Sequence, residues 1–180
     1  TMCSDDIAEI RKAKEIASYW INADNKEQAG WVKDLLSRLN IIGNTNTVVC
    51  ILDTGVNNGH PLLAPVLEDG KCQTINSAWG TNDEVGHGTQ MAGLATYGDL
   101  QRCLETAGIV HLRHKLESVK LLERSQSDGD SHIYGHNTSQ AISRAETEAP
   151  KARRIICLAV ATPDGRDKGR PSSWSGAIDK

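Results

Sequence analysis

The periodicity of hydrophobic positions changes near residue 47, and this change divides the chain into two parts. Before it, apolar residues recur at helical spacing in two stretches, which comprise Ile7, Ile10, Ala13, Ala17, Trp20 and Ile21, and then Val32, Leu35, Leu36 and Leu39. Ser4 is placed to cap the first stretch, and Asp24 with Glu27 fits a capping-box pattern before the second. Asn40 and Gly43 follow as stop signals. We therefore expect a helical hairpin over residues 1–45, docked on the main domain, with an inhibitory or partner-binding extension as the alternative interpretation.

Strand and helix patterns alternate through the second part of the chain. The apolar runs that predict core strands lie at residues 48–52, 119–122 and 155–161, with weaker strand candidates at 72–75 and 109–116. Helical spacing covers residues 89–97 and 134–148, and a further helix begins over 173–180. Strands that alternate with helices imply βαβ units and a parallel sheet. The expected fold is α/β, with one parallel sheet flanked by helices in a single domain over residues 46–180.

Composition excludes several classes of partner and cofactor. The chain carries 20 Lys and Arg against 23 Asp and Glu, with both signs interspersed, so it offers no basis for binding nucleic acid or an anionic membrane. Its longest apolar run is too short to span a bilayer, and its N-terminus is acidic where a signal peptide would be basic. The five cysteines form no CxxC pair. We therefore expect a cytoplasmic protein with reduced thiols and without a cofactor.

Two short motifs carry the candidate chemistry. The apolar run at residues 48–52 ends in Asp53-Thr54-Gly55, and residues 86–93 read Gly-His-Gly-Thr-Gln-Met-Ala-Gly. Active residues of an open parallel sheet gather at the carboxyl ends of strands, where Asp53 falls. A carboxylate bonded to one ring nitrogen of His87 would fix the tautomer in which the other nitrogen takes a proton from a serine. Asp53 and His87 are therefore the candidate catalytic pair.

Each of these two residues also has a simpler explanation. An aspartate after a strand is commonly a turn residue, and a histidine before a helix is commonly a cap or a surface residue. The two together, in these motifs and this order, favour the catalytic interpretation. Metal binding is a poorer alternative because His87 lacks a second ligand at a spacing such as HExxH. We interpret His111 and His114, three residues apart in a strand-like run, as surface residues and expect no metal site.

These motifs resemble those of the subtilisin-like serine proteases. Residues 48–56 followed by His60-Pro61 look like the family's aspartate motif, and residues 87–93 resemble its histidine motif, usually His-Gly-Thr-His-Val-Ala-Gly. Residues 118–122 are similar to the family's Ala-Val-Lys-Val-Leu strand, and the likeness covers about residues 46 to 180. The resemblance implies the three-layer subtilisin-like fold. It also implies a serine endopeptidase that hydrolyses polypeptides by an Asp-His-Ser triad, in the chain order known for subtilisin.

The same resemblance implies where a substrate would bind. Residues 155–163 resemble the strand and edge segment that pairs with the substrate backbone, so Ala159, Val160 and Ala161 are the expected substrate-binding residues. The family usually reads Ser-Leu-Gly-Gly along this edge, and the different residues here imply different local subsites. Leu62 also replaces the aspartate that often binds structural calcium in the family's His-Pro-Asp-Leu sequence. That calcium site is therefore not expected.

A convincing nucleophilic serine does not occur in the 180 residues. Ser172, Ser173 and Ser175 lack a Gly-x-Ser-x-Gly context, and Ser172 or Ser173 is better explained as a helix N-cap. We expect the family's serine motif and oxyanion-hole asparagine to lie in a C-terminal half outside this sequence, which would make the chain an inactive portion of the domain. An incomplete sheet predicts self-association. The alternative is a pseudo-protease or interaction module that binds extended peptides along residues 155–161.

Overall fold

The computed structural model describes residues 18–42, 46–123, 134–160 and 170–179. The predicted Ser4 cap and the apolar positions from Ile7 to Ala17 lie outside the described residues. Helix α1 spans Ser18–Ile21 and helix α2 spans Asn25–Ser37. The Asp24 carboxylate accepts a hydrogen bond of 2.8 Å from the backbone N–H of Glu27, which confirms Asp24 as the N-cap of α2.

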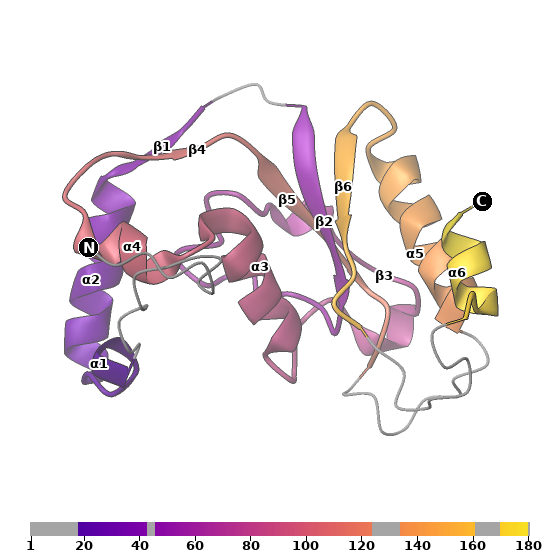
Figure 1. The fold of residues 1–180 in the computed structure, drawn as a ribbon, viewed down its shortest axis with the longest axis horizontal. Coiled ribbons are helices and arrows are strands. Elements are labelled where there is room, and N and C mark those ends of the chain that lie inside the picture. The colour runs from indigo at the N-terminus through magenta and orange to yellow at the C-terminus, as the bar shows by residue number, and fades with distance from the viewer. Residues whose placement is uncertain (1–17, 43–45, 124–133, 161–169, 180) are drawn as a thin grey trace, which may run out of the picture.

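A four-stranded parallel sheet forms the centre of the molecule, in the order β3-β5-β2-β6 (Figure 1). Its strands are β2 (Thr47–Asp53), β3 (Cys72–Thr74), β5 (Lys115–Lys120) and β6 (Arg153–Cys157). Strand β2 pairs with β5 on one side and with β6 on the other, both in parallel. Strand β2 contributes buried side chains to clusters on both faces of the sheet, and this accounts for its nearly continuous apolar sequence.

Helices cover both faces of this sheet, as Figure 1 shows. Helix α3 (His87–Tyr97) lies on one face, where Ala92 and Ile51 share a buried cluster. Helix α5 (Tyr134–Glu148) lies on the other, where its Ala141 packs in a cluster with Cys50. Successive residues of a strand point to opposite faces, so β2 contributes to both clusters. The predicted α/β fold, a parallel sheet flanked by helices, is confirmed.

A second, two-stranded parallel sheet pairs β1 (Leu39–Ile41) with β4 (Val110–Leu112). This corrects two predictions, because Leu39 was expected in the second helix and residues 109–116 as one strand. Helix α2 ends at Ser37, and the next residue, Arg38, donates from its guanidinium to the carbonyl oxygens of Gly108 and Cys103. These long-range bonds link the end of α2 to helix α4 (Leu100–Glu105) and to the segment that follows it, and they set β1 beside β4.

Strands β5 and β6 differ from their predicted ranges. Strand β5 begins four positions earlier than residue 119 and ends at Lys120, and β6 covers residues 153–157 in place of 155–161. The apolar run at 155–161 was expected to be a core strand, part of whose surface an incomplete sheet would leave exposed or covered by another segment or chain. Ile155 is 60% exposed, and Ile156 is 38% exposed. Strand β6 has one partner among the described residues, so its apolar side chains lack neighbours on the far side.

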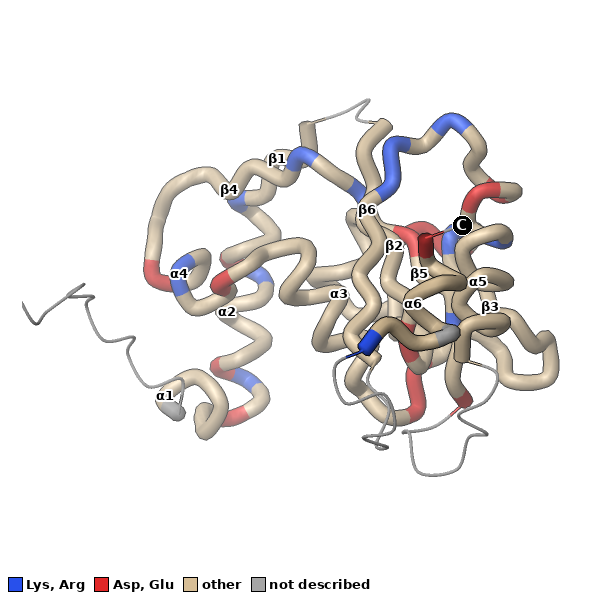
Figure 2. The backbone as a smooth tube through the Cα atoms, turned by 45° about the vertical axis from the view of Figure 1, so that its right-hand side comes forward, with Lys and Arg blue, Asp and Glu red and all other residues tan. Residues whose placement is uncertain are grey.

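The remaining described elements are short. They are the 3-10 helices η1 (Asp69–Lys71) and η2 (Ser77–Trp79) and helix α6 (Ser173–Ile178), which Ser172 caps as predicted. Charged residues of both signs are distributed over the described backbone (Figure 2). None of the described helices has the length and apolar character that crossing a membrane requires.

Candidate active site

Asp53 is the last residue of β2 and lies at the carboxyl end of the sheet. Its side chain is only 2% exposed. Oδ1 of Asp53 accepts a hydrogen bond of 2.8 Å from the backbone N–H of Thr54, and the Thr54 hydroxyl lies 3.2 Å from the same oxygen. A buried carboxylate needs donors such as this backbone N–H, because an unpaired charge would be strongly destabilising there.

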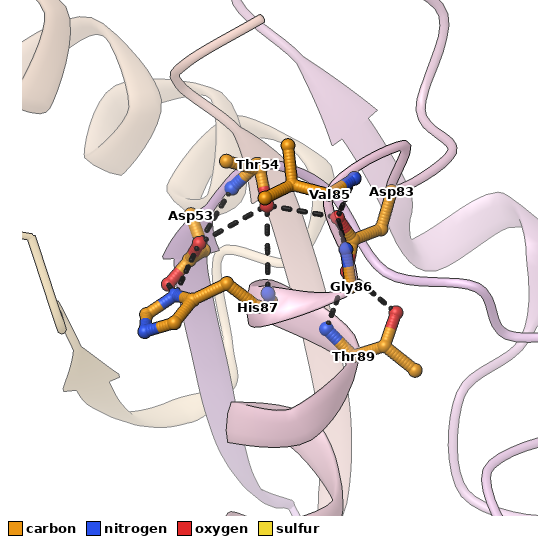
Figure 3. A network of polar contacts seen from close by, with 8 residues as sticks. Asp53, Thr54, Asp83, Val85, Gly86, His87 and Thr89 are labelled. Atoms are coloured by element: carbon orange, nitrogen blue, oxygen red, sulfur yellow. Dashed lines mark hydrogen bonds and ion pairs between the residues drawn. The ribbon is translucent and has the colours of Figure 1, made fainter. Parts of the chain in front are cut away.

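His87 is the first residue of α3, and its ring faces Asp53 directly (Figure 3). Nδ1 of His87 lies 2.9 Å from Oδ2 of Asp53 and 3.0 Å from Oδ1. An ionised carboxylate only accepts hydrogen bonds, so Nδ1 carries the proton and Nε2 of the neutral ring is left as an acceptor. The His87 side chain is 44% exposed, which leaves the ring open to an incoming group. The predicted contact between Asp53 and His87 is confirmed.

The backbone before α3 turns sharply to present this ring. Gly86, the N-cap of the helix, has φ 90°, in the left-handed region that favours glycine. The turn lets the chain enter α3 with His87 already in the first helical position. A residue with a Cβ atom would carry a steric cost at position 86.

Asp83 is a site residue that sequence reasoning missed. Its carboxylate accepts hydrogen bonds from the backbone N–H groups of Val85, Gly86 and Thr89 and from the hydroxyls of Thr54 and Thr89, as Figure 3 shows. Burial raises the pKa of Asp83, but the hydrogen bonds from Thr89, Gly86 and Thr54 outweigh burial and lower it below its ordinary value. The signal in the sequence was an acidic residue four positions before His87, which alone does not distinguish a ligand of backbone N–H groups from a loop residue.

Lys120, which the sequence placed in a core strand, is a second residue that sequence reasoning did not assign to the site. It ends β5 directly beside Asp53 in the strand register and is fully buried. Its Nζ donates to the carbonyl oxygen of Asn82 at 2.7 Å and to that of Trp79 at 3.4 Å. Lys120 therefore ties the segment that precedes α3 to the carboxyl end of the sheet.

The serines considered as alternative nucleophiles lie far from this pair in the fold. Ser172 and Ser175 hydrogen-bond to each other in the capping box of α6. Helix α6, which also contains Ser173, packs on α5, on the face of the sheet opposite α3 (Figure 1). Serines on α6 therefore lie across the sheet from His87.

Cys157 is the described thiol nearest to the pair in the strand register, two positions before the point on β6 that would face Asp53. Burial raises the pKa of the Cys157 thiol, and the charge of Asp53 raises it further. A cysteine nucleophile needs the opposite, a lowered pKa that makes the thiolate available. Cys157 therefore behaves as a small apolar residue. No group of three or more His, Cys, Asp or Glu side chains that could hold a metal occurs among the described residues.

The predicted substrate-binding residues follow directly after β6. Ala159 is exposed, whereas Val160 is half-buried and packs against the cluster on the α5 face. Ala161 lies outside the described residues. Substrate binding by these residues stays a prediction.

Comparison with known proteins decides the family of this chain. A sequence model of the subtilase family, a family of serine proteases, matches residues 44–180, more than half of the chain. The chain belongs to the subtilase family. The match begins just before β2, so α1, α2 and β1 precede the part that resembles other subtilases. No curated protein and no solved structure matches the chain.

Proposed function

We propose that this subtilase chain supplies the aspartate and the histidine of a serine endopeptidase that cleaves polypeptides by an Asp-His-Ser triad. The observation that carries the proposal is the contact of 2.9 Å between Nδ1 of His87 and Oδ2 of Asp53, at the carboxyl end of the sheet. A nucleophilic serine, which we place outside these 180 residues, completes the triad.

The chemistry follows from the state of the His87 ring. With Nδ1 bonded to Asp53, Nε2 is free to accept the proton of a serine hydroxyl as that oxygen attacks a peptide carbonyl. The buried carboxylate then stabilises the imidazolium that forms. In the next step Nε2 returns the proton to the leaving amine, and the peptide bond breaks. The oxyanion requires donors of its own, which the resemblance assigns to an asparagine outside this sequence.

The proposed substrate is an extended polypeptide that lies along β6 and the residues after it. Strand β6 pairs with β2 on one edge, and its other edge has no strand partner among the described residues. An extended peptide can add to such an edge through backbone hydrogen bonds. The backbone of Ala159 and Val160, which follow β6 directly, would continue this pairing.

The test is covalent labelling of the polypeptide encoded by the complete reading frame with a serine-directed fluorophosphonate. We expect one labelled serine, a complete loss of labelling in His87→Ala and a rate roughly 10⁴-fold lower in Asp53→Asn. His111→Ala is the matched control, because His111 is exposed on β4, outside the candidate site, and should leave labelling unchanged. Absence of a labelled serine, or labelling that survives in His87→Ala, would overturn the proposal.

The open edge of β6 favours one alternative function, a peptide-binding module without catalysis. In that case the protein binds extended peptides, but no serine reacts with the probe. The substitution His87→Ala then leaves the affinity for peptide unchanged. Peptide binding measured by calorimetry beside the labelling experiment separates the two functions.

A further inference from the structure

We propose that Asp83 is a positioning residue for the Asp53–His87 pair. It accepts the hydrogen bond of the Thr54 hydroxyl, which would otherwise be donated to Asp53, and so strengthens the bond between Asp53 and His87. This inference rests on the proposed function of Asp53 and His87. It concerns how the pair is held, and it identifies a residue that local sequence pattern did not single out.

The Thr54 hydroxyl stands between two carboxylates. Its Oγ1 lies 2.9 Å from Oδ1 of Asp83 and 3.2 Å from Oδ1 of Asp53. A hydroxyl has a single proton to donate, so the two acidic residues compete for it. The shorter contact is the one to Asp83, and the proton therefore goes there.

The destination of this proton matters for His87. Oδ1 of Asp53 already accepts from the backbone N–H of Thr54 and lies 3.0 Å from Nδ1 of His87. A further hydrogen bond from the hydroxyl would withdraw negative charge from this oxygen and weaken its bond to the ring. By accepting the hydrogen bond from the hydroxyl, Asp83 spares Oδ1 of Asp53 a further donor beyond the Thr54 N–H, so both Asp53 oxygens can hold Nδ1–H of His87.

The remaining contacts of Asp83 explain why its side chain cannot move away. Its Oδ2 accepts from the N–H and the hydroxyl of Thr89, at 2.8 Å and 2.7 Å, and its Oδ1 accepts from the N–H of Gly86 at 2.8 Å. Asn57 exchanges two further hydrogen bonds with the Asp83 backbone. Asp83 thus anchors the first turn of α3 and the Thr54 hydroxyl through one rigid carboxylate.

The test reads the hydrogen bond between Asp53 and His87 from the downfield Nδ1–H resonance of His87 in NMR spectra of the 180-residue chain. We expect Asp83→Asn to lose this resonance or shift it strongly upfield, because an amide cannot accept all the hydrogen bonds that the carboxylate accepts. In the double variant Asp83→Asn with Thr54→Val, the competing hydroxyl is gone and the resonance should return. Thr89→Val is the matched control: it removes one hydroxyl from Asp83 but leaves Thr54 in place, and it should keep the resonance.

Two outcomes would overturn the proposal. If the double variant stays as defective as Asp83→Asn, the role of Asp83 is confined to anchoring α3. If Thr54→Val alone moves the His87 resonance markedly, the hydroxyl already donates to Asp53 in the parent chain, and this measurement applies even where Asp83→Asn does not fold. Neither outcome depends on a reactive serine, so failure of this inference is distinguishable from failure of the proposed function.

Discussion

A Cβ atom at position 88 would lie only 2.0 Å from the carbonyl oxygen of Gly55. The absence of a side chain at Gly88 therefore lets the first turn of α3 rest directly on the backbone that follows β2. The same Cβ would approach the Cβ of Asp53 to 3.1 Å. This close approach brings His87, the neighbour of Gly88, within hydrogen-bonding distance of Asp53.

We expect Gly88→Ala to separate α3 from β2 and to lower the free energy of unfolding by about 1–3 kcal/mol or more. Urea denaturation measures the loss, and the downfield His87 resonance should disappear with it. Gly93→Ala, in the same helix, is the control because its added Cβ would meet no atom within 4 Å apart from its chain neighbours and the nearby backbone of its own helix. This variant should be about 0.5–1 kcal/mol more stable than the parent. Equal stability of the two variants would contradict the packing argument.

The buried ion pair between Arg154 and Glu117 leads to a second prediction. Nε of Arg154 lies 2.7 Å from Oε2 of Glu117, and Nη2 donates to the carbonyl oxygens of Ala145 and Ala149 at the end of α5. The hydrogen bond to Glu117 raises the pKa of the Arg154 guanidinium above its ordinary value. Glu117→Ala leaves this charge buried without its partner, and we expect a cost of about 3–5 kcal/mol in urea denaturation.

Glu68→Ala is the matched control for this pair. Glu68 also makes a carboxylate contact of 2.7 Å, to Nζ of Lys115, but both side chains are exposed. Solvent screens such a pair, and its loss should cost less than about 1 kcal/mol. A similar cost for both variants would mean that burial of the Arg154 pair has no energetic consequence.

A third prediction concerns acid stability and Asp83. Its pKa is lower in the folded protein than in the unfolded chain, because the folded state donates hydrogen bonds to the ionised carboxylate. The stability that Asp83 contributes is therefore present above the unfolded pKa of about 3.9, and it is lost as the pH falls through the folded pKa. We expect Asp83→Asn to be less stable than the parent at neutral pH, with a difference that narrows below about pH 4.

Urea denaturation of both chains at a series of pH values checks this prediction. Asp34→Asn serves as the control, since the Asp34 side chain on α2 is 63% exposed. Its effect should stay within about 0.5 kcal/mol of the parent across the range. If the difference in free energy of unfolding between Asp83→Asn and the parent stays constant down to acidic pH, the assigned direction of the pKa shift is wrong.

A fourth prediction is that the 180-residue chain self-associates through β6. Ile155 is 60% exposed on the strand whose outer edge has no partner among the described residues. An open edge with an apolar side chain recruits other chains, and a charge on the edge prevents this. Light scattering over a dilution series should therefore detect association that Ile155→Lys reduces.

Ile178→Lys is the control for Ile155→Lys, because Ile178 is 48% exposed but lies on α6 rather than on the sheet edge. It should leave association unchanged. A parent chain that stays monomeric at high concentration, or equal effects of the two lysine variants, would contradict association through β6.

Local sequence pattern was sufficient to predict the candidate catalytic residues and most of the helices and strands around them. The apolar run before Asp53 and the glycines around His87 are short-range signals, and the predicted boundaries of α5 agree with the observed Tyr134–Glu148. A strand covered on both faces leaves a continuous apolar run, and a helix with one apolar face leaves a periodic pattern, each within its own residues. The sequence also carried the N-cap at Asp24, whose partner is three residues away.

The features that only the tertiary structure decided are contacts between residues far apart in the chain. Leu39 follows a helical pattern, yet it pairs in register with Val110 and becomes part of a strand. Asp83 looks like an ordinary loop residue until folding brings its carboxylate to Thr54 and to the first turn of α3. Such contacts depend on where the backbone places residues that are distant in the sequence. The effect of a buried charge, or of a strand edge with free hydrogen-bonding groups, depends on which of those residues lie beside it. The sequence by itself therefore pointed to Asp53 and His87 as candidates, whereas their mutual geometry and the residues that hold it were decided by the fold.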